Sequence, residues 1–258
     1  MPRRPYLKLF FREAGSGPPL LIIPGNTASS ASHAGELAHF GQRYRTIALD
    51  LPGTGQSGRL AVWPHDWWAA GALAAINLLD QLQIPRCAVL GTSGGAAIAL
   101  LAALAAPGRI AAIVADSVVA HFPAADVRAQ VAARSERSPA QRAFWSLAHG
   151  GDWAQVIDAD TAMLATYAAS GVNYFGGQLA QIPCPVLLTA SLADPVLPAV
   201  GDQLCAMARA IPQCWLFLTN AGDHPLMWSR PDEFRLVTDT FLDRFWASAL
   251  PGTSDATG

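Results

Sequence analysis

Short apolar runs alternate with longer segments of helical periodicity along most of the chain. The run at 20–23 contains only Leu and Ile and stops at Pro and Gly, which is typical of a buried parallel strand. By such patterns we expect strands at 6–12, 20–23, 44–49, 86–90, 110–115, 185–190 and 215–218. The 3.6-residue period predicts helices at 32–41, 66–83, 94–106, 199–210 and 231–246. The second of these helices should bury the face formed by Leu73, Ile76, Leu79 and Leu82.

The alternation breaks between residues 121 and 180. No strand pattern occurs there, and short helices are expected at 124–134, 139–148 and 153–169. Strands that alternate with helices predict an α/β fold with a mostly parallel central sheet and helices on both faces. The core should therefore comprise residues 1–120 and 181–250, with residues 121–180 inserted as a helical lid. The small and polar residues 251–258 should form a disordered tail.

The composition favours an enzyme that acts on a small molecule. The length of 258 residues suits one domain with a large core, which needs no metal or disulfide for stability. The net charge is −2 and no basic run exceeds two residues, which argues against nucleic acid or an anionic membrane as partner. The expected partner is a small acyl substrate that is neutral or weakly charged, and the oligomeric state is left open.

The four cysteines lack the spacing of a metal site and are expected to be reduced. Cys184 and Cys214 each open a predicted strand, so a disulfide between them is the alternative. Lys8 and Arg12 interrupt the apolar residues near the N-terminus, which argues against a signal peptide. No apolar stretch is long enough to span a bilayer once Gly and Pro are counted as breaks. We therefore expect a cytoplasmic protein.

Ser93 lies in the sequence Gly-Thr-Ser-Gly-Gly, which matches GxSxG between a predicted strand and a predicted helix. A serine on such a sharp turn has a strained backbone, and the flanking glycines avoid side-chain clashes. The turn lifts the hydroxyl clear of the sheet and directs the next N–H, from Gly94, toward the place where an oxyanion forms. We expect Ser93 to be a nucleophile, the alternative being an ordinary helix N-cap.

A serine nucleophile needs a base and an acid that orients the base. His224 follows the last strand, at the sheet edge that also carries Ser93, and is the expected base. Asp194 follows the preceding strand and is the expected acid, with Asp116, which also follows a strand, as its competitor. Asp223 is too close in sequence to His224 to bond its ring. The other five histidines lie on early helices, loops or the lid, where a solvated or hydrogen-bonded role is expected.

The loop after the strand at 20–23 should supply the second oxyanion donor, the backbone N–H of Asn26. Thr27 is the substitute, and a plain turn is the alternative. The residues expected to line the substrate pocket are Thr27, Thr92, Phe122, Trp145 and Trp228. Other lid aromatics either join this pocket or only pack the lid on the core: Phe144, Trp153, Tyr167, Tyr174 and Phe175. Trp63, Trp67 and Trp68 are expected to pack between helices.

These motifs resemble the α/β-hydrolase family with a helical lid, over nearly the whole chain. The segments that carry the resemblance are Pro24-Gly25-Asn26, residues 50–57, the turn at Ser93, residues 194–198 and Gly222-Asp223-His224. The segment lengths are similar to those of the valacyclovir-hydrolase (biphenyl hydrolase-like) group, which cleaves esters of α-amino acids. In that group an acidic residue after the nucleophile binds the substrate ammonium, but Gly94 stands here, so that specificity is not carried over. Pro24 replaces the usual His of the oxyanion loop.

The residues and the resemblance together predict hydrolysis of a small carboxylic ester through an acyl-enzyme. Ser93 would attack the carbonyl, His224 would carry the proton and Asp194 would hold the imidazole. No metal ion or organic cofactor is expected. The same triad can act on a lactone, a thioester, a C–C bond or a peroxy acid, so these reactions stay open. A ligand-binding protein with little turnover is the alternative from another class.

Overall fold

A computed structural model describes residues 8–60 and 62–246 of the chain. Its centre is a seven-stranded sheet in the order β1-β3-β2-β4-β5-β8-β9, in which β1 runs antiparallel to β3 and the other strands are parallel. The strands are β1 Phe10–Ala14, β2 Pro19–Ile23, β3 Arg45–Asp50, β4 Cys87–Thr92, β5 Ile110–Asp116, β8 Val186–Ser191 and β9 Cys214–Thr219. The predicted tail at 251–258 lies outside the described residues, as does the start of the strand expected at 6–12.

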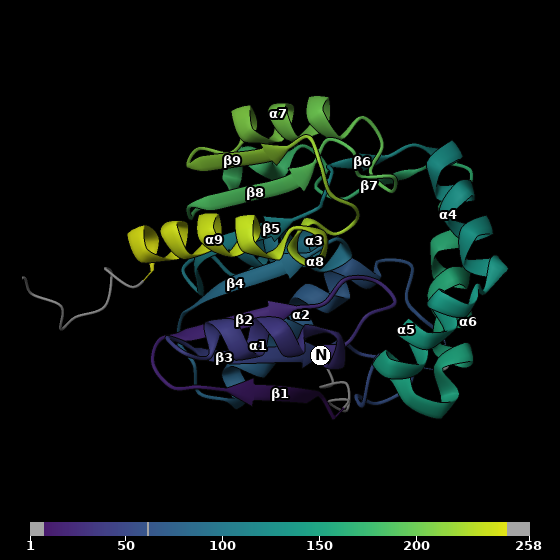
Figure 1. The fold of residues 1–258 in the computed structure, drawn as a ribbon, viewed down its shortest axis with the longest axis horizontal. Coiled ribbons are helices and arrows are strands. Elements are labelled where there is room, and N and C mark those ends of the chain that lie inside the picture. Colours follow the sequence, from purple (N-terminus) through teal and green to yellow (C-terminus); the bar gives the residue numbers. More distant parts are fainter. Residues whose placement is uncertain (1–7, 61, 247–258) are drawn as a thin grey trace, which may run out of the picture.

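Helices cover both faces of this sheet (Figure 1). The helices α1 (Ala34–Phe40) and α9 (Pro231–Phe245) pack on one face, and α2 (Trp67–Gln81), α3 (Gly94–Ala105) and α7 (Val200–Ala210) on the other. Every residue of β4 and β5 is buried, because both faces of these central strands are covered. This burial explains why the strands are continuous apolar runs in the sequence. The expected mostly parallel sheet with two helical layers is confirmed.

The buried face of α2 differs from the predicted one. Leu79 is buried, but Leu73 is 57% exposed and points away from the core. The small residue Gly71 lies against α3 instead, where a Cβ atom would be 2.8 Å from Cδ1 of Ile98. The remaining buried residues of α2 are Trp67, Trp68, Ala72, Ala74, Ala75 and Leu78. The predicted face is confirmed in part, because Leu79 is buried and Ile76 and Leu82 pack half-buried against the core. The small buried residues were missed because the prediction followed the large aliphatic ones, whereas the close packing of α2 on α3 requires small ones.

Residues 121–180 form a separate helical block beside the carboxyl ends of the parallel strands (Figure 1). The expectation that no strand occurs there is wrong, because β6 (His121–Phe122) pairs with β7 (Val172–Asn173) in an antiparallel ribbon. Two residues are too few to show a period of two, so the sequence could not reveal this ribbon. The other elements of the block are α4 Ala124–Glu136, α5 Pro139–His149, the 3-10 turns Gly150–Asp152 and Gln178–Gln181, and α6 Trp153–Ala165. Its role as a lid stays a prediction.

All four cysteines are free, so the suggested disulfide between Cys184 and Cys214 is not formed. Burial raises the pKa of the Cys87 and Cys184 thiols to about 12, which keeps both protonated and unreactive near neutral pH. Within residues 8–60 and 62–246, no helix is long and apolar enough to cross a membrane. The same residues contain no cluster of His, Cys, Asp and Glu side chains that could hold a metal ion.

The contact between α3 and β2 should depend on Gly95. A Cβ atom there would lie 2.1 Å from the carbonyl oxygen of Ile23 and 2.5 Å from that of Pro24, and neither backbone atom can move aside. We expect Gly95→Ala to lower the free energy of unfolding by about 1–3 kcal/mol or more. Gly151→Ala is the control, since a Cβ atom at Gly151 would meet nothing within 4 Å. Urea denaturation measures both variants, and equal stabilities would contradict this close approach.

Candidate active site

Ser93 joins β4 to α3 with a backbone conformation that side chains rarely adopt. Its φ is 53° and its ψ is −124°, in a region that costs about 1–3 kcal/mol for a residue other than glycine. The surrounding backbone holds this strain, because the Ser93 N–H donates to the carbonyl of Asp116 at 2.8 Å. Gly91 and Gly95 approach closely beneath the turn, where a Cβ atom on Gly91 would lie 2.4 Å from the Gly95 carbonyl oxygen. The strained turn therefore fixes where the hydroxyl lies.

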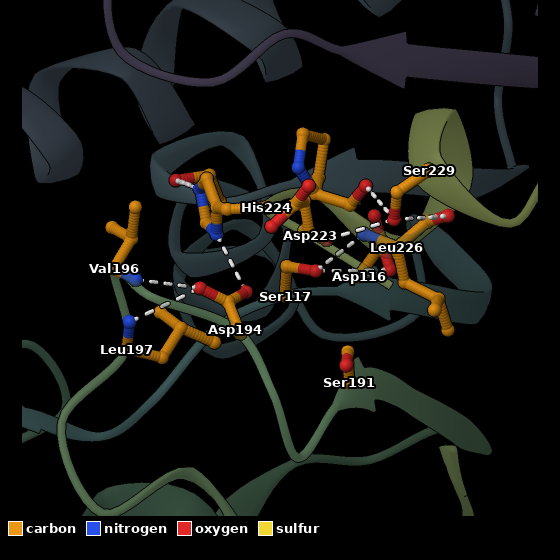
Figure 2. Close-up of polar contacts among 12 residues, drawn as sticks. Asp116, Ser117, Ser191, Asp194, Val196, Leu197, Asp223, His224, Leu226 and Ser229 are labelled. Carbon is orange, nitrogen blue, oxygen red and sulfur yellow. Dashed lines mark hydrogen bonds and ion pairs between the residues drawn. The ribbon is translucent and has the colours of Figure 1, made fainter. Parts of the chain in front are cut away.

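A hydrogen-bonded series joins Ser93 to two other side chains from loops at the same sheet edge. Nε2 of His224 lies 2.9 Å from Oγ of Ser93, and Nδ1 of His224 lies 2.8 Å from Oδ2 of Asp194. The other carboxylate oxygen of Asp194 accepts from the backbone N–H groups of Val196 and Leu197, at 2.8 and 3.2 Å (Figure 2). The Asp194 side chain is fully buried and that of His224 is 15% exposed. The carboxylate thus favours the tautomer with hydrogen on Nδ1, which leaves Nε2 able to accept a proton from Ser93.

Asp116, the competing candidate for the acid, bonds elsewhere. Its carboxylate accepts from the hydroxyls of Thr189 at 2.7 Å and Thr92 at 3.3 Å, and from the N–H of Met227 at 3.2 Å. Asp116 and His224 are both described, and no hydrogen bond joins them. Complete burial raises the pKa of Asp116 to about 6. By holding Met227 at the start of the short helix α8 (Leu226–Ser229), Asp116 supports the loop that carries His224.

The loop after β2 lies directly against the turn at Ser93. A Cβ atom on Gly25 would lie 3.1 Å from Cβ of Ser93. The side chain of Asn26 is held at both ends, because its Oδ1 accepts from Nε1 of Trp68 at 3.1 Å and its Nδ2 donates to Oδ1 of Asp160 at 2.6 Å. No described residue accepts a hydrogen bond from the Asn26 backbone N–H. Two side-chain anchors therefore fix a residue whose backbone donor is unused.

Thr27 is held by a histidine of the helical block. It has a φ of 62°, and its carbonyl oxygen lies 3.0 Å from Nε2 of His149. Nδ1 of the same ring accepts from the N–H of Gly55 at 3.0 Å, so the ring hydrogen must be on Nε2. Burial lowers the pKa of His149 to about 4, and the ring is therefore neutral near pH 7. His149 thus joins α5 to two loops of the sheet edge.

A buried ion pair lies beside the Asn26 side chain. Oδ2 of Asp160, on α6, accepts from Nη1 of Arg134, on α4, at 2.5 Å. The Asp160 side chain has no exposed surface and that of Arg134 is 14% exposed. Burial raises the pKa of Asp160, while the Arg134 charge and the Asn26 hydrogen bond oppose that change. The pair links two helices of the block to the loop after β2.

A cavity of about 490 Å³ opens over Ser93 and His224, within the range of small-molecule sites. Of the residues expected to form a substrate pocket, those that line it are Thr27, Thr92, Phe122, Trp145 and Trp228, together with Phe144 and Tyr174. Trp153, Tyr167 and Phe175 do not line it and pack against other aromatic rings instead. Trp63 stacks on Trp67 as expected for helix packing, but Trp68 lines the cavity. Asn26 and Gly94 also line it.

Three polar residues around this cavity were not among the candidates from the sequence: Arg134, His149 and Asp160. Asp160 had a detectable signal, because it falls in phase with the buried positions Val156, Ile157, Met163 and Leu164 of α6. A carboxylate within an apolar stripe indicates a buried partner. His149 had the same signal, because it lies four residues after Trp145 on the buried face of α5. Arg134 carries a weaker signal, since Val127 is the one buried residue of α4.

The chain is similar to known hydrolases over different lengths. A family model described as alpha/beta hydrolase fold matches residues 18–157. The pimeloyl-[acyl-carrier protein] methyl ester esterase of Methylococcus capsulatus is 35% identical over 106 residues, which cover 41% of this chain and only 39% of that esterase. Serine hydrolase BPHL of Mus musculus is 25% identical over 249 residues, covering 91% of this chain and 82% of that protein. The crystal structure of a hydrolase from Pseudomonas aeruginosa PA01 has a TM-score of 0.73 at 23% identity, covering 92% and 94% of the two chains.

Asp116 should make the stability of the protein depend on pH. Its pKa of about 6 in the folded protein lies above the ordinary value of 3.8, so the folded state binds the proton more tightly than the unfolded chain. The Asp116 contribution to the free energy of unfolding therefore falls as pH rises from about 4 to about 6. The free energy of unfolding of Asp116→Asn, relative to that of wild type, should therefore rise by up to about 3 kcal/mol across that window, with no further rise above pH 7. Urea denaturation between pH 4 and 8 measures this difference, and a pH-independent difference would contradict it.

Proposed function

The chain belongs to the α/β-hydrolase fold family, and we propose that it is a serine hydrolase that cleaves a small carboxylic ester. The observation that supports this most directly is the hydrogen-bonded series from Ser93 through His224 to Asp194 at a cavity wall. A hydroxyl, an imidazole and a buried carboxylate in this order are the groups that acyl transfer requires. The curated relatives described as an esterase and a serine hydrolase support the same reaction class.

The reaction proceeds in two steps. Oγ of Ser93 attacks the ester carbonyl carbon while Nε2 of His224 accepts the hydroxyl proton, and Asp194 stabilises the imidazolium that forms. Collapse of the tetrahedral intermediate breaks the bond to the alkoxy oxygen, which leaves as the alcohol with the proton from His224. Water then attacks the acyl-enzyme ester with His224 as base, which releases the carboxylic acid and restores the Ser93 hydroxyl.

The backbone N–H groups of Asn26 and Gly94 stabilise the oxyanion in this proposal. Gly94 is the first residue of α3, so its N–H has no acceptor within the helix and lies at the positive end of the helix dipole. Asn26 is fixed by Trp68 and Asp160 before substrate arrives, and donors already in place need no reorganisation during the reaction. Both residues line the same cavity as Ser93.

Residues 121–180 act as the lid over this site. Phe122, Arg134, Phe144 and Trp145 of this block line the cavity, so its position determines how much of the site is open to water. A cover that excludes water strengthens the electrostatic interactions beneath it. The aromatic walls provide an apolar surface for the substrate.

Ser93→Ala should abolish ester hydrolysis. We expect kcat for short-chain p-nitrophenyl esters to fall by about a thousandfold or more, because among the described residues only the Ser93 hydroxyl is hydrogen-bonded to His224. Labelling of the wild-type protein with a fluorophosphonate, read by mass spectrometry, should place the label on Ser93 and give none in the variant. Labelling without turnover would redirect the proposal to another acyl bond. The absence of both labelling and turnover in a folded wild-type protein would refute a serine hydrolase.

Two aspartates near His224, Asp194 and Asp223, should differ sharply in their effect on catalysis. Asp194→Asn should lower kcat by about 10⁴-fold, because an amide in place of the carboxylate favours the wrong His224 tautomer. Asp223→Asn is the matched control, since Asp223 is exposed, adjacent to His224 and not bonded to its ring. Its kcat should stay within about twofold of wild type. Steady-state kinetics at pH 8 measure both, and similar losses in the two variants would remove Asp194 from the triad.

A further inference from the structure

Arg134 is the one permanently charged side chain on the cavity wall among the described residues. We propose that it binds a carboxylate of the substrate, so that the substrate class is an ester that carries a second, free carboxylate. This inference rests on the proposed function and adds a specificity to it. It also differs from the neutral or weakly charged substrate that the overall composition favours.

The guanidinium of Arg134 has donors that the protein leaves unused. A guanidinium has five N–H donors, and among the described residues only Asp160 accepts from Arg134, through Nη1. The other donors belong to a side chain that lines the cavity and retains some exposed surface. A carboxylate can bind such a guanidinium edge through two parallel hydrogen bonds.

Asp160 orients the guanidinium of Arg134 and leaves its cavity-facing N–H groups available to a ligand. Its carboxylate is fully buried and does not line the cavity, so the counter-charge lies behind Arg134 as seen from a ligand. Asp160 is itself fixed by the Asn26 amide. A cation held in place before binding loses little conformational freedom when the anion arrives. Because Asp160 already offsets part of the charge, the site fits a singly charged carboxylate better than a doubly charged phosphate.

The surroundings of Arg134 add to this preference. Gln130 lies one turn earlier on α4 and lines the cavity with Tyr174, whose pKa is raised by burial so that the phenol keeps its hydrogen. Both groups can donate to a carboxylate oxygen. The nearby wall residues Val127 and Leu164 are apolar, and a charge pair is stronger in such surroundings than in water.

An ammonium group has no matching partner in this cavity. No acidic side chain lines its wall in the described part of the chain. An acidic residue at position 94 would also displace the Asn26 side chain, since a Cβ atom on Gly94 would lie 2.0 Å from its Oδ1. The charge preference is therefore opposite to that of hydrolases that use an acidic residue after the nucleophile to bind an amino ester.

A set of matched esters tests this proposal. Monoethyl adipate carries the carboxylate, its primary amide replaces that group with a neutral isostere, and ethyl 6-aminohexanoate carries an ammonium. The monoethyl esters of succinic and suberic acids vary the spacing. We expect wild-type kcat/KM to be at least about tenfold higher for the best half-ester than for its amide, mainly through a lower KM, and lowest for the amino ester. A wild-type ratio of one or below would overturn the proposal.

Arg134→Met should bring the ratio of half-ester to amide close to one. The double variant Arg134→Met/Asp160→Asn should do the same, and it avoids leaving Asp160 buried without its counter-charge. Arg134→Lys should give an intermediate ratio, since it keeps the charge but loses the paired donors. Arg128→Met is the control, because Arg128 lies exposed on the same helix away from the cavity and should leave the ratio as in wild type.

The comparison of two substrates keeps the result independent of any general loss of activity. A ratio that stays high in both Arg134→Met variants would overturn the assignment of Arg134. Failure of the proposed function has a different signature, in which wild type hydrolyses none of the esters or Ser93→Ala hydrolyses them equally well. Calorimetric binding of monoethyl adipate to Ser93→Ala, with and without Arg134→Met, measures recognition without turnover. We expect Arg134→Met to raise the Kd of monoethyl adipate by about tenfold or more.

Discussion

The close contact of α3 with β2 and β4 is the constraint on which the site depends. Gly91 and Gly95 let three backbone segments meet where any Cβ atom would clash, and this contact holds Ser93 in its strained conformation. Because β2, β4, β8 and β9 run parallel, the loops after β2, β8 and β9 begin at the same edge as this turn. Asn26, Asp194 and His224 can therefore reach Ser93 from segments far apart in the sequence.

A buried polar network makes the second connection, between the helical block and the sheet edge. Asp160 and His149 come from the block and bond to Asn26 and Thr27, in the loop beside the turn at Ser93. Such bonds are directional, and a buried partner left alone incurs a desolvation penalty, so they define one arrangement more strictly than apolar packing does. The loop after β2 thus takes its conformation partly from residues more than a hundred positions later in the chain.

Features that depend on one segment could be predicted from the sequence, whereas features that depend on the packing of two segments could not. The central strands are recognisable because burial on both faces makes them continuous apolar runs, and their order along the chain shows that the loops of Ser93, Asp194 and His224 share an edge. The buried face of α2 was predicted only in part, because the fit of Gly71 against α3 is a property of two helices and not of one. Arg134 was missed for the same reason, since its pattern on α4 is that of an ordinary solvated arginine.

Asp160 has two partners, and this sharing couples two parts of the site. One oxygen accepts from Arg134 and the other from the Asn26 amide, so a ligand carboxylate that draws on the guanidinium also alters the charge felt by Asp160. A weaker hold by Arg134 removes part of the positive charge that opposes the burial-induced rise in the pKa of Asp160. Binding of a carboxylate at Arg134 would therefore act, through Asp160, on the hydrogen bond that anchors Asn26. Changes at Arg134 and Asn26 should for this reason be non-additive, as expected for residues that share one hydrogen-bonded partner.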